Sequence, residues 1–339
     1  MLALALLVAL VAIPGVGQAK SKSKKKASAH ASVSNPKIGI QDASYLMFAS
    51  PLYLNFHMKI TRYIAPYDAV AHSSDMSKAR LFFEAAAKEH VQVLVAFYHS
   101  NYTPLHNPSV SAYTRDVKKF VADFGGITEF QPWDESNRGN IPHMQASPDA
   151  KLAAEYYVAL RGVLAKARQC RHGCADVGLD VLDQANDKTT IKFIHQWIAE
   201  VKHLHKPLPT IWGLHNYSDT NRFSDSRTKK LVNTFPGGQV WITETGGIVQ
   251  FGKGFPKSLS RASRAIKQMV TDARSSKKIT RLYVYNWFPA VGNNIRFDSG
   301  LVNGKNDPRP GYFTLCKYIK GANCSTSYWA KKGLPEANN

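Results

Sequence analysis

The feature that most constrains the fold of this sequence is an eightfold alternation of β-type runs with helical stretches after residue 36. The β-type runs are short, and most are rich in Val, Ile and aromatic residues, which is typical of strands buried on both faces. Such alternation indicates a parallel sheet whose strands are joined by helices. The predicted strands are Lys37–Gln41, Lys59–Ile64, Val91–Tyr98, Ile127–Pro132, Asp176–Leu182, Thr210–His215, Gln239–Thr243 and Ile279–Asn286.

Helical patterns lie between these runs. Residues 76–89 are dense in good helix formers, and Ser147 followed by Pro148 predicts a helix start with Ser147 as the N-cap. The residues that follow place one apolar face at spacings of three and four. That face comprises Leu152, Tyr156, Leu160, Val163 and Ala167. Further helices are predicted over 189–203, 223–233, 258–274 and 312–319.

Eight strand–helix units in about 300 residues predict a single (β/α)8 TIM barrel. A doubly wound open sheet is the alternative, but no Gly-rich phosphate-binding fingerprint follows the first predicted strand. No linker or low-complexity break interrupts the pattern, so we expect one domain over 35–339.

The N-terminal stretch is not expected to belong to that domain. Residues 2–12 are apolar and uncharged, and Gly17-Gln18-Ala19 offers a small-x-small cleavage site, so 1–19 is predicted to be a signal peptide. The apolar run is too short to span a bilayer, which makes an uncleaved anchor the weaker alternative. Lys20–Lys26 carries five Lys and no acid, and we expect 20–34 to be a disordered basic tail. The sequence therefore predicts a secreted or cell-wall-associated protein, without stable membrane insertion after signal cleavage.

The formal net charge of +20 favours an anionic partner. The Lys and Arg residues are spread along the chain, and the sequence has no zinc-finger spacing, RNA-recognition signature or basic zipper, so nucleic acid is not expected. We expect instead weak attachment to an anionic cell-wall polymer through Lys20–Lys26.

The four cysteines form two close pairs along the chain, Cys170 with Cys174 and Cys316 with Cys324. Four cysteines allow three connectivities, but local closure of each pair is the simplest in an oxidising compartment. Neither spacing is the two-residue knuckle that zinc ligation favours. Two local structural disulfides are therefore predicted.

The candidate chemistry lies where the predicted strands end, because reacting groups of such barrels sit at the carboxyl ends of their strands. The fourth strand runs into 133–137 (WDESN) and the seventh into 244–247 (ETGG). Other strand ends carry Arg62, His215, Tyr217 and Trp287. Two carboxylates on separate strands, with basic and aromatic residues at the same rim, predict cleavage of a glycosidic bond.

Each candidate has an expected role in that chemistry. One carboxyl group, that of Glu135, must stay protonated, and an ionised Asp134 beside it would raise its pKa. Arg62 would hold Glu244 ionised, and Trp287 would offer a flat apolar face to a sugar ring. His99 and Asn101 are candidate contacts at the rim. Glu129 and Asp180 are assigned no role, and Trp133, Trp212 and Trp241 are expected in the core.

These motifs resemble those of clan A retaining glycoside hydrolases, the barrel superfamily of cellulases, β-mannanases, β-xylosidases and β-glucuronidases. The resemblance covers the whole predicted barrel and rests on 133–137 (WDESN), 242–246 (ITETG), 215–217 (HNY), Trp287, and the tail segments 298–304 and 309–312. It implies that Glu135 is the acid/base and Glu244 the nucleophile. It also implies that Arg62, His215, Tyr217 and Trp287 bind substrate or support the nucleophile.

Asp134 departs from the family pattern, which usually has Asn before the acid/base. Asn can donate a hydrogen bond to the sugar 2-hydroxyl, whereas an ionised Asp only accepts one. The mechanism needs no metal or cofactor, and the 12 His show no metal-ligand spacing.

The resemblance implies a secreted β-glycoside hydrolase that acts on a poly- or oligosaccharide by double displacement. A transglycosylase on the same site, a non-catalytic carbohydrate- or wall-binding barrel, and a structural protein that binds anionic polymers are the alternatives. A retaining mechanism requires the carboxyl carbons of Glu135 and Glu244 to lie about 5–5.5 Å apart.

Overall fold

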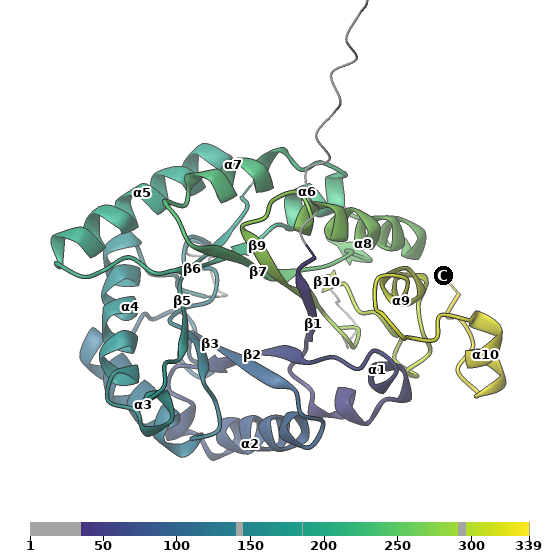
Figure 1. The fold of residues 1–339 in the computed structure, drawn as a ribbon, viewed down its shortest axis with the longest axis horizontal. Helices are drawn as coiled ribbons and strands as arrows, with labels where there is room; N and C mark the ends of the chain where they lie inside the picture. The colour runs from purple at the N-terminus through teal and green to yellow at the C-terminus, as the bar shows by residue number, and fades with distance from the viewer. Residues whose placement is uncertain (1–34, 140–144, 185, 291–295, 339) are drawn as a thin grey trace, which may run out of the picture. The chain divides into compact units, whose positions relative to one another are not determined.

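A computed structural model of the chain describes residues 35–139, 145–184, 186–290 and 296–338. These residues form a closed barrel of eight parallel strands, with helices around its outside (Figure 1). Because the first strand also pairs with the last, the barrel has no open edge, which confirms the predicted (β/α)8 fold and excludes the open sheet. The barrel strands are β1 Lys37–Gln41, β2 Ile60–Pro66, β3 Gln92–Tyr98, β4 Glu129–Gln131, β5 Ala175–Leu182, β6 Ile211–His215, β7 Gln239–Thr245 and β9 Ile279–Tyr285.

All eight predicted strands are confirmed, each boundary to within two residues. A further short pair of strands, β8 Gln250–Phe251 and β10 Phe297–Asp298, forms a separate antiparallel sheet after the barrel strands β7 and β9. The predicted signal peptide 1–19 and basic tail 20–34 lie outside the described residues.

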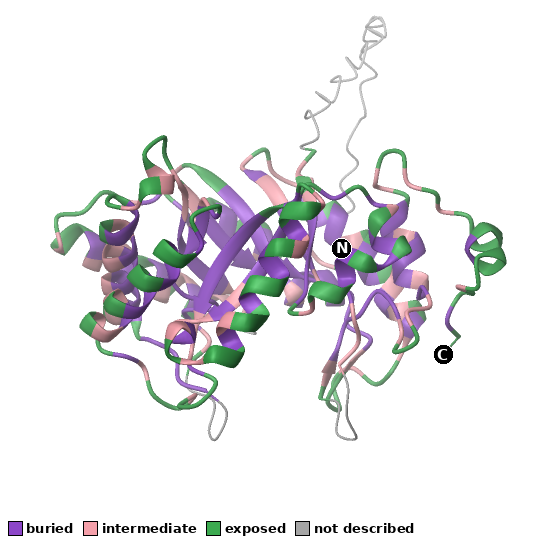
Figure 2. Ribbon diagram, turned by 90° about the horizontal axis from the view of Figure 1, so that it is seen from below, coloured by how far each residue is buried: buried purple, intermediate pink, exposed green. Residues whose placement is uncertain are grey.

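Helices follow most of the barrel strands. Their bounds are α1 Pro51–Leu54, α2 Ser73–Lys88, α3 Val110–Asp123, α4 Ala150–Leu164, α5 Asp187–His203, α6 Tyr217–Arg222, α7 Ser226–Thr234, α8 Leu259–Ala273, α9 Pro310–Cys316 and α10 Thr326–Lys331. Figure 2 shows buried residues along the strands and on the inner sides of the helices, with exposed residues facing outward. Among the described residues, no helix is long and apolar enough to cross a lipid bilayer.

Two predicted helix starts are too early by two or more residues, and four helices were not predicted. α4 starts at Ala150 because the side chain of Asp149, not that of Ser147, accepts the N-capping hydrogen bond, from the Leu152 N–H at 2.8 Å. α7 starts later than residue 223 because Phe223 takes a left-handed conformation that ends α6. The missed helices are α1, α3, α6 and α10. In α3 the β-branched residues weaken the helical signal, and the other three have six residues or fewer.

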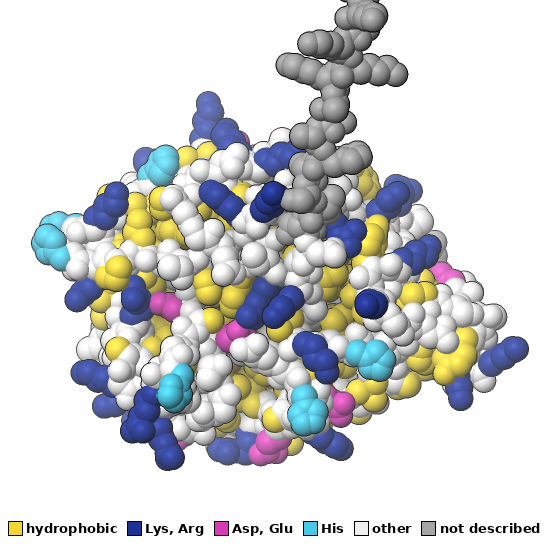
Figure 3. Space-filling view, viewed as in Figure 1, with side chains coloured by type: hydrophobic (Ala, Val, Ile, Leu, Met, Phe, Trp, Pro, Cys, Tyr) yellow, Lys and Arg dark blue, Asp and Glu magenta, His cyan; other side chains and the backbone are white. Residues whose placement is uncertain are grey.

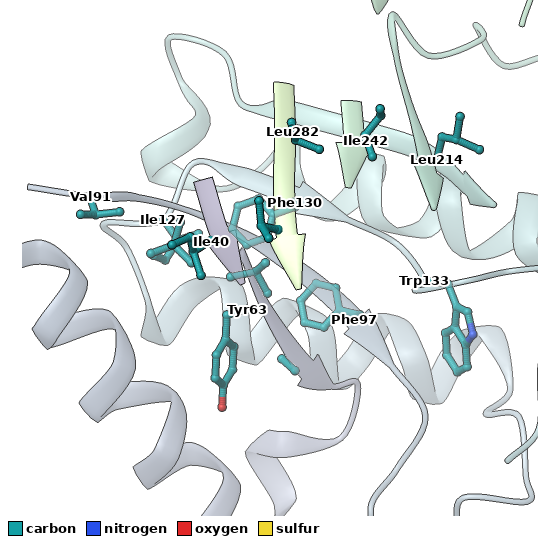
Figure 4. Packing of buried hydrophobic residues seen from close by; sticks show 14 of the residues in the cluster. Ile40, Tyr63, Val91, Phe97, Ile127, Phe130, Trp133, Leu214, Ile242 and Leu282 are labelled. Carbon is teal, nitrogen blue, oxygen red and sulfur yellow. The ribbon is translucent and has the colours of Figure 1, made fainter. Parts of the chain in front are cut away.

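Two layers of side chains stabilise the barrel. Its interior holds Ile60, Leu94, Val177, Trp241 and Tyr283. The larger layer lies between strands and helices and includes Phe97, Phe130, Trp133 and Ile242 (Figure 4). Trp133, Trp212 and Trp241 are buried, as predicted. The interior also holds the Glu129 carboxylate, which accepts from both terminal guanidinium nitrogens of Arg281 at 2.6 and 2.7 Å.

The predicted cysteine pairing is confirmed. Cys170 is bonded to Cys174 and Cys316 to Cys324, with Cα separations of 4.9 and 5.6 Å. Both separations lie inside the range that a disulfide requires, roughly 4.4–6.8 Å. The first bridge closes the turn after α4 and the second joins α9 to the segment before α10.

The basic residues are distributed in space as they are along the sequence. On the face shown in Figure 3, Lys and Arg side chains are spread among polar and apolar ones, with few acids between them. A dispersed distribution of this kind favours weak, non-specific attraction of anionic surfaces over recognition of one shaped ligand.

Candidate active site

Glu244 lies near the end of β7, where the regular alternation of the strand is broken. Pairing between β6 and β7 runs from Leu214 with Ile242 to His215 with Glu244, so β7 contains one extra residue at this point. Irregularities of this kind re-aim a side chain. Ile242 packs in the core between strands and helices. The extra residue turns Glu244 instead toward side chains of other barrel strands.

Three donors hold the Glu244 carboxylate. Its Oε2 accepts from Nε2 of Gln41 at 2.6 Å and from Nη1 of Arg62 at 3.0 Å. Its Oε1 accepts from the hydroxyl of Tyr217 at 3.0 Å. The contact with the guanidinium is charge-assisted and therefore strong. Both predicted supports, Arg62 and Tyr217, thus contact Glu244, and Gln41 joins them.

Glu135 is held in an unusual backbone conformation directly after β4. Its φ of 46° lies in the left-handed region, which residues other than Gly rarely adopt. The Glu135 N–H donates to Oδ2 of Asp180 at 3.2 Å, and the Ser136 N–H donates to the Asp180 carbonyl oxygen at 3.0 Å. Conformations of this kind cluster at functional sites and persist only where the surroundings impose them. Here β5, through Asp180, imposes it.

The side chain of Glu135 lies between two basic groups. Nδ1 of His215 lies 3.0 Å from Oε1, and the guanidinium of Arg138 forms an ion pair with Oε2. Burial alone would raise the pKa of Glu135, but the hydrogen bond and charge of His215 and the charge of Arg138 hold it below its usual value. The expectation that Asp134 keeps Glu135 protonated is therefore wrong, because these two cations outweigh Asp134.

His215 bridges Glu135 and Asp180. It is fully buried, and its Nε2 lies 2.9 Å from Oδ2 of Asp180. Burial would lower the pKa of His215, but the charges of Asp180 and Glu244 raise it well above its usual value. Burial would likewise raise the pKa of Asp180, yet His215 and Arg62 lower it to about 2. The imidazolium form of His215 is therefore favoured: Nδ1 hydrogen-bonds to Glu135, whereas Nε2 forms an ion pair with Asp180 without hydrogen-bond geometry.

Arg62 is the centre of the charge network. Its guanidinium is fully buried, forms an ion pair with Asp134 and lies 3.0 Å from Glu244 and 3.7 Å from Asp180. Nη1 also donates to Oε1 of Gln41 at 2.7 Å. Because a buried charge is tolerated only when it is paired, these carboxylates and Arg62 depend on one another.

Asp134, which stands where the resembling family has Asn, behaves differently from an ordinary surface acid. Burial raises its pKa to about 7, although the charges of Arg62 and His215 oppose that rise. A substantial fraction of Asp134 is therefore protonated near neutral pH, and a protonated carboxyl can donate a hydrogen bond. The expectation that Asp134 can accept a hydrogen bond but not donate one therefore applies only to its ionised form.

The donor set does not favour a metal ion. Asp134, Asp180 and His215 offer three atoms within 4.8 Å of one another, and so do Glu135, His215 and Glu244. Both groups depend on His215, which must lose a proton to ligate a metal. In addition, Arg62 already contacts the two aspartates of the first group.

Three further predicted rim residues share no hydrogen bond or ion pair with the two glutamates among the described residues. Trp287 is fully buried against Tyr53, Phe56 and Tyr312, so it presents no exposed face to a sugar ring, and its interpretation as a sugar platform is wrong for this arrangement. Nδ1 of His99 contacts the Ser100 carbonyl oxygen at 2.9 Å. The Asn101 amide donates to Oδ1 of Asp75 at 3.2 Å, on α2.

Sequence reasoning missed three residues of the site, namely Gln41, Arg138 and Asp180. Gln41 is the last residue of the first predicted strand, and its position was the available signal. Asp180 was expected in the barrel interior or a loop and was assigned no role. The pairing of β5 with β6 shifts between Val177 and Asp180, which a sequence pattern does not reveal. Arg138 carries only one signal, its spacing of three residues from Glu135.

The buried carboxyl group of Asp272, on α8, leads to a prediction about the stability of the fold. Asp272 is fully buried and accepts hydrogen bonds from the Gln268 amide at 2.7 Å and the Thr220 hydroxyl at 3.3 Å. Burial raises its pKa from 3.8 to about 7. Between these values the folded protein binds more protons at Asp272 than the unfolded chain does, so this contribution to stability falls as the pH rises.

We therefore expect Asp272→Asn to flatten the pH dependence of the unfolding free energy between about pH 4 and 7, by on the order of 2–4 kcal/mol relative to the wild type. Urea unfolding at several pH values measures this difference. Asp123→Asn, at an exposed position of α3, is the matched control. Parallel curves for the wild type and Asp272→Asn would contradict the prediction.

Comparison with known proteins supports the fold. No protein-family model matches the sequence, and no curated protein sequence matches it. Among solved structures, a fungal β-1,4-galactanase is 11% identical with a TM-score of 0.59, over 82% of this chain and 98% of that one. Xylanase B from Clostridium stercorarium F9 is 11% identical with a TM-score of 0.60, over 84% and 97%. A family 39 glycoside hydrolase from Bacteroides cellulosilyticus WH2 is 14% identical with a TM-score of 0.55, over 84% and 64%.

The class of protein follows from the fold and the resemblance. The chain is a (β/α)8 barrel that is similar in fold to glycoside hydrolases, as the sequence motifs predicted. At these identities the likeness concerns the fold, and the chemistry has to be argued from the residues of the site.

Proposed function

We propose that this protein is a retaining β-glycoside hydrolase with Glu244 as nucleophile and Glu135 as acid/base. One observation carries the proposal: Glu244 is oriented at both oxygens by Gln41, Arg62 and Tyr217, and one of its oxygens lies within 4.8 Å of an oxygen of Glu135. Retaining enzymes need two carboxyl groups about 5–5.5 Å apart, and inverting enzymes place them about 6.5–9.5 Å apart to admit a water. The short separation of the oxygens supports the retaining geometry.

The proposed reaction has two steps. First, an oxygen of Glu244 attacks the anomeric carbon, the bond to the leaving oxygen breaks, and Glu135 gives that oxygen a proton. Second, Glu135 takes a proton from water, the water oxygen bonds to the anomeric carbon, and Glu244 leaves as a carboxylate. The charge of His215 and that of Arg138 favour the ionised Glu135 that the second step requires.

The charge network favours an enzyme over a non-catalytic binding barrel. A sugar-binding site needs donors and aromatic faces, whereas this site buries four carboxyl groups, three of which are paired with Arg62. Burying so many charged groups is costly. Such a cost is typical of sites where charge develops during a reaction.

The test is a screen of hydrolysis against 4-nitrophenyl β-glucoside, β-galactoside, β-xyloside and β-mannoside, together with β-linked polysaccharides. We expect turnover of at least one substrate by the wild type, and loss of that turnover in Glu135→Gln and Glu244→Gln. If no glycoside is turned over while carbohydrate or wall polymer binds strongly, the binding barrel replaces the enzyme. Product analysis at high sugar concentration separates hydrolysis from transglycosylation.

We also propose that the protein is secreted and adheres weakly to anionic wall polymer through Lys20–Lys26. The two disulfides and the basic charge support this proposal. Deleting residues 20–34 is expected to weaken binding to an anionic wall polymer and to make its salt dependence shallower, because fewer counterions are displaced. Turnover of a small neutral glycoside should not change. Unaltered polymer binding after the deletion would contradict this role of the tail.

A further inference from the structure

Arg138 occupies the side of Glu135 opposite His215. It lies three residues after Glu135, and its N–H donates to the Glu135 carbonyl oxygen at 2.9 Å. Its guanidinium forms an ion pair with Oε2 of Glu135, while the side chain remains 31% exposed. Arg62, in contrast, is completely buried. Arg138 is therefore a cation that both contacts the acid/base and reaches solvent.

This contact conflicts with the first step of the proposed reaction. Oε1 of Glu135 is occupied by His215 and Oε2 by Arg138, and both partners stabilise a carboxylate. A protonated Glu135 has to direct its O–H at the leaving oxygen, and both cations oppose the protonation that this step needs. Withdrawal of the guanidinium from Oε2 therefore favours Glu135 as an acid.

The surroundings of Arg138 indicate what would attract it away. Among the described ion pairs, Arg138 contributes only to the one with Glu135. Among the described groups whose charge acts on Arg138, Asp134 is the acid besides Glu135, and it is already paired with Arg62. Two other described neighbours offer no anion: burial and the charge of Arg138 lower the pKa of His99, and the Gln145 amide donates to the Tyr98 hydroxyl. A neutral sugar offers a guanidinium only hydroxyl groups, whereas a carboxylate, sulfate or phosphate offers a charged, bidentate acceptor.

We propose that Arg138 forms an anion-binding subsite beside the scissile bond, and that the natural substrate carries an anionic group on its leaving-group unit. This inference rests on the proposed glycosidase function and names its substrate class as acidic. The anionic group binds the guanidinium of Arg138 and releases Oε2 of Glu135. The same contact therefore holds the leaving-group unit and frees the acid/base for protonation.

The experiment compares two aryl glycosides of one sugar, a 4-nitrophenyl and a 3-carboxy-4-nitrophenyl β-glycoside, with the sugar chosen from the hydrolysis screen. We expect kcat/KM of the wild type to be at least about tenfold higher for the carboxylated compound, an effect of one charged contact. In Arg138→Gln this ratio should fall close to that expected from leaving-group reactivity alone, and Arg138→Lys should retain part of the preference. Lys118→Gln, which removes an exposed cation on α3, is the matched control for general charge attraction.

A second measurement separates this role from a structural one. Removing Arg138 should move the basic limb of the pH profile of kcat/KM for the neutral glycoside to higher pH, since Glu135 then keeps its proton longer. Lys118→Gln should leave that limb in place. The other titratable groups that face Glu135 stay the same in both variants; they are Asp134, Asp180, His215, Glu244, Tyr98, Tyr217 and Tyr285.

The inference is overturned if the wild type shows no preference for the carboxylated glycoside, or if Arg138→Gln keeps the preference. Failure of the proposed function has a different outcome, since the wild type then hydrolyses neither compound. In that case, calorimetric measurement of the binding of the same two glycosides shows whether Arg138 forms an anion subsite. Tighter binding of the carboxylated compound that is lost in Arg138→Gln supports the anion subsite, and equal or absent binding contradicts it.

Discussion

Glu244→Gln is expected to lower kcat for an aryl β-glycoside by on the order of 10⁴-fold or more, because an amide cannot form the glycosyl ester on which the reaction depends. The fold should survive, since the amide oxygen still accepts from Arg62 or Tyr217 and Arg62 keeps two other carboxylates. Steady-state kinetics with a 4-nitrophenyl β-glycoside measure the loss. Glu84→Gln, at an exposed position on α2, is the matched control and should be fully active.

Glu135→Gln tests which of the two glutamates is the nucleophile and which is the acid/base. A 2,4-dinitrophenyl leaving group needs little protonation, so this variant should still form the glycosyl-enzyme from a dinitrophenyl glycoside, whereas Glu244→Gln should not. If instead Glu135→Gln blocks that first step and Glu244→Gln does not, the roles are reversed. Equal and small effects of both substitutions would contradict a catalytic role for either glutamate.

Arg62→Met is expected to lower the free energy of unfolding by about 3–5 kcal/mol, the range for removing one partner of a buried ion pair. The reason is that Asp134, Asp180 and Glu244 would lose their common cation without gaining access to water. Arg62→Lys should restore part of the stability, because a lysine supplies the charge but not the planar set of donors. Urea unfolding at neutral pH measures both variants.

The matched control is Lys229→Met, which removes an exposed lysine paired with the partly exposed Asp225. Exposed ion pairs contribute about 0–1 kcal/mol, so this variant should be nearly as stable as the wild type. A similar loss for both variants would mean that the network around Arg62 contributes no more than a surface pair. The interpretation of Arg62 as the centre of the site would then be wrong.

The barrel could be predicted from the sequence because its signals are local and repeated. Each strand is a short apolar run, and parallel strands joined by helices meet at one rim, so the ends of β4, β6 and β7 had to converge. Convergence placed Glu135, His215 and Glu244 in one group, and Arg62, the third of seven residues in β2, reaches that group with its side chain. These residues contact one another because the strand order of the barrel brings them together, although they lie far apart in the sequence.

The remaining parts of the site depend on irregularities that a sequence pattern does not reveal. Asp180 faces the site because the pairing of β5 with β6 shifts by one residue, and Glu135 is aimed by a left-handed backbone conformation. The prediction that Trp287 faces a sugar ring failed for a different reason. A strand-end Trp can face either the rim or the core, and here aromatic neighbours surround it. Local propensity does not distinguish these two outcomes.

The protonation states were also beyond sequence reasoning. Adjacency of Asp134 and Glu135 suggested that repulsion would keep Glu135 protonated, but the pKa of each group depends on which cations contact it in space. Arg138 and His215 reverse the expected direction for Glu135, while burial raises the pKa of Asp134 to about 7. The pKa shifts of the two acids therefore run opposite to the directions that the sequence indicated.

The covalent role of Glu244 can be tested directly by trapping the glycosyl-enzyme. A 2-deoxy-2-fluoro-β-glycoside of the preferred sugar with a dinitrophenyl leaving group slows both steps, because the fluorine destabilises the positively charged transition state, while the leaving group keeps the first step accessible. Mass spectrometry of the intact protein and of its peptides should show one added fluorosugar, on the peptide that contains Glu244, and none in Glu244→Gln. Inactivation without an adduct, or an adduct on any other residue, would contradict Glu244 as the nucleophile.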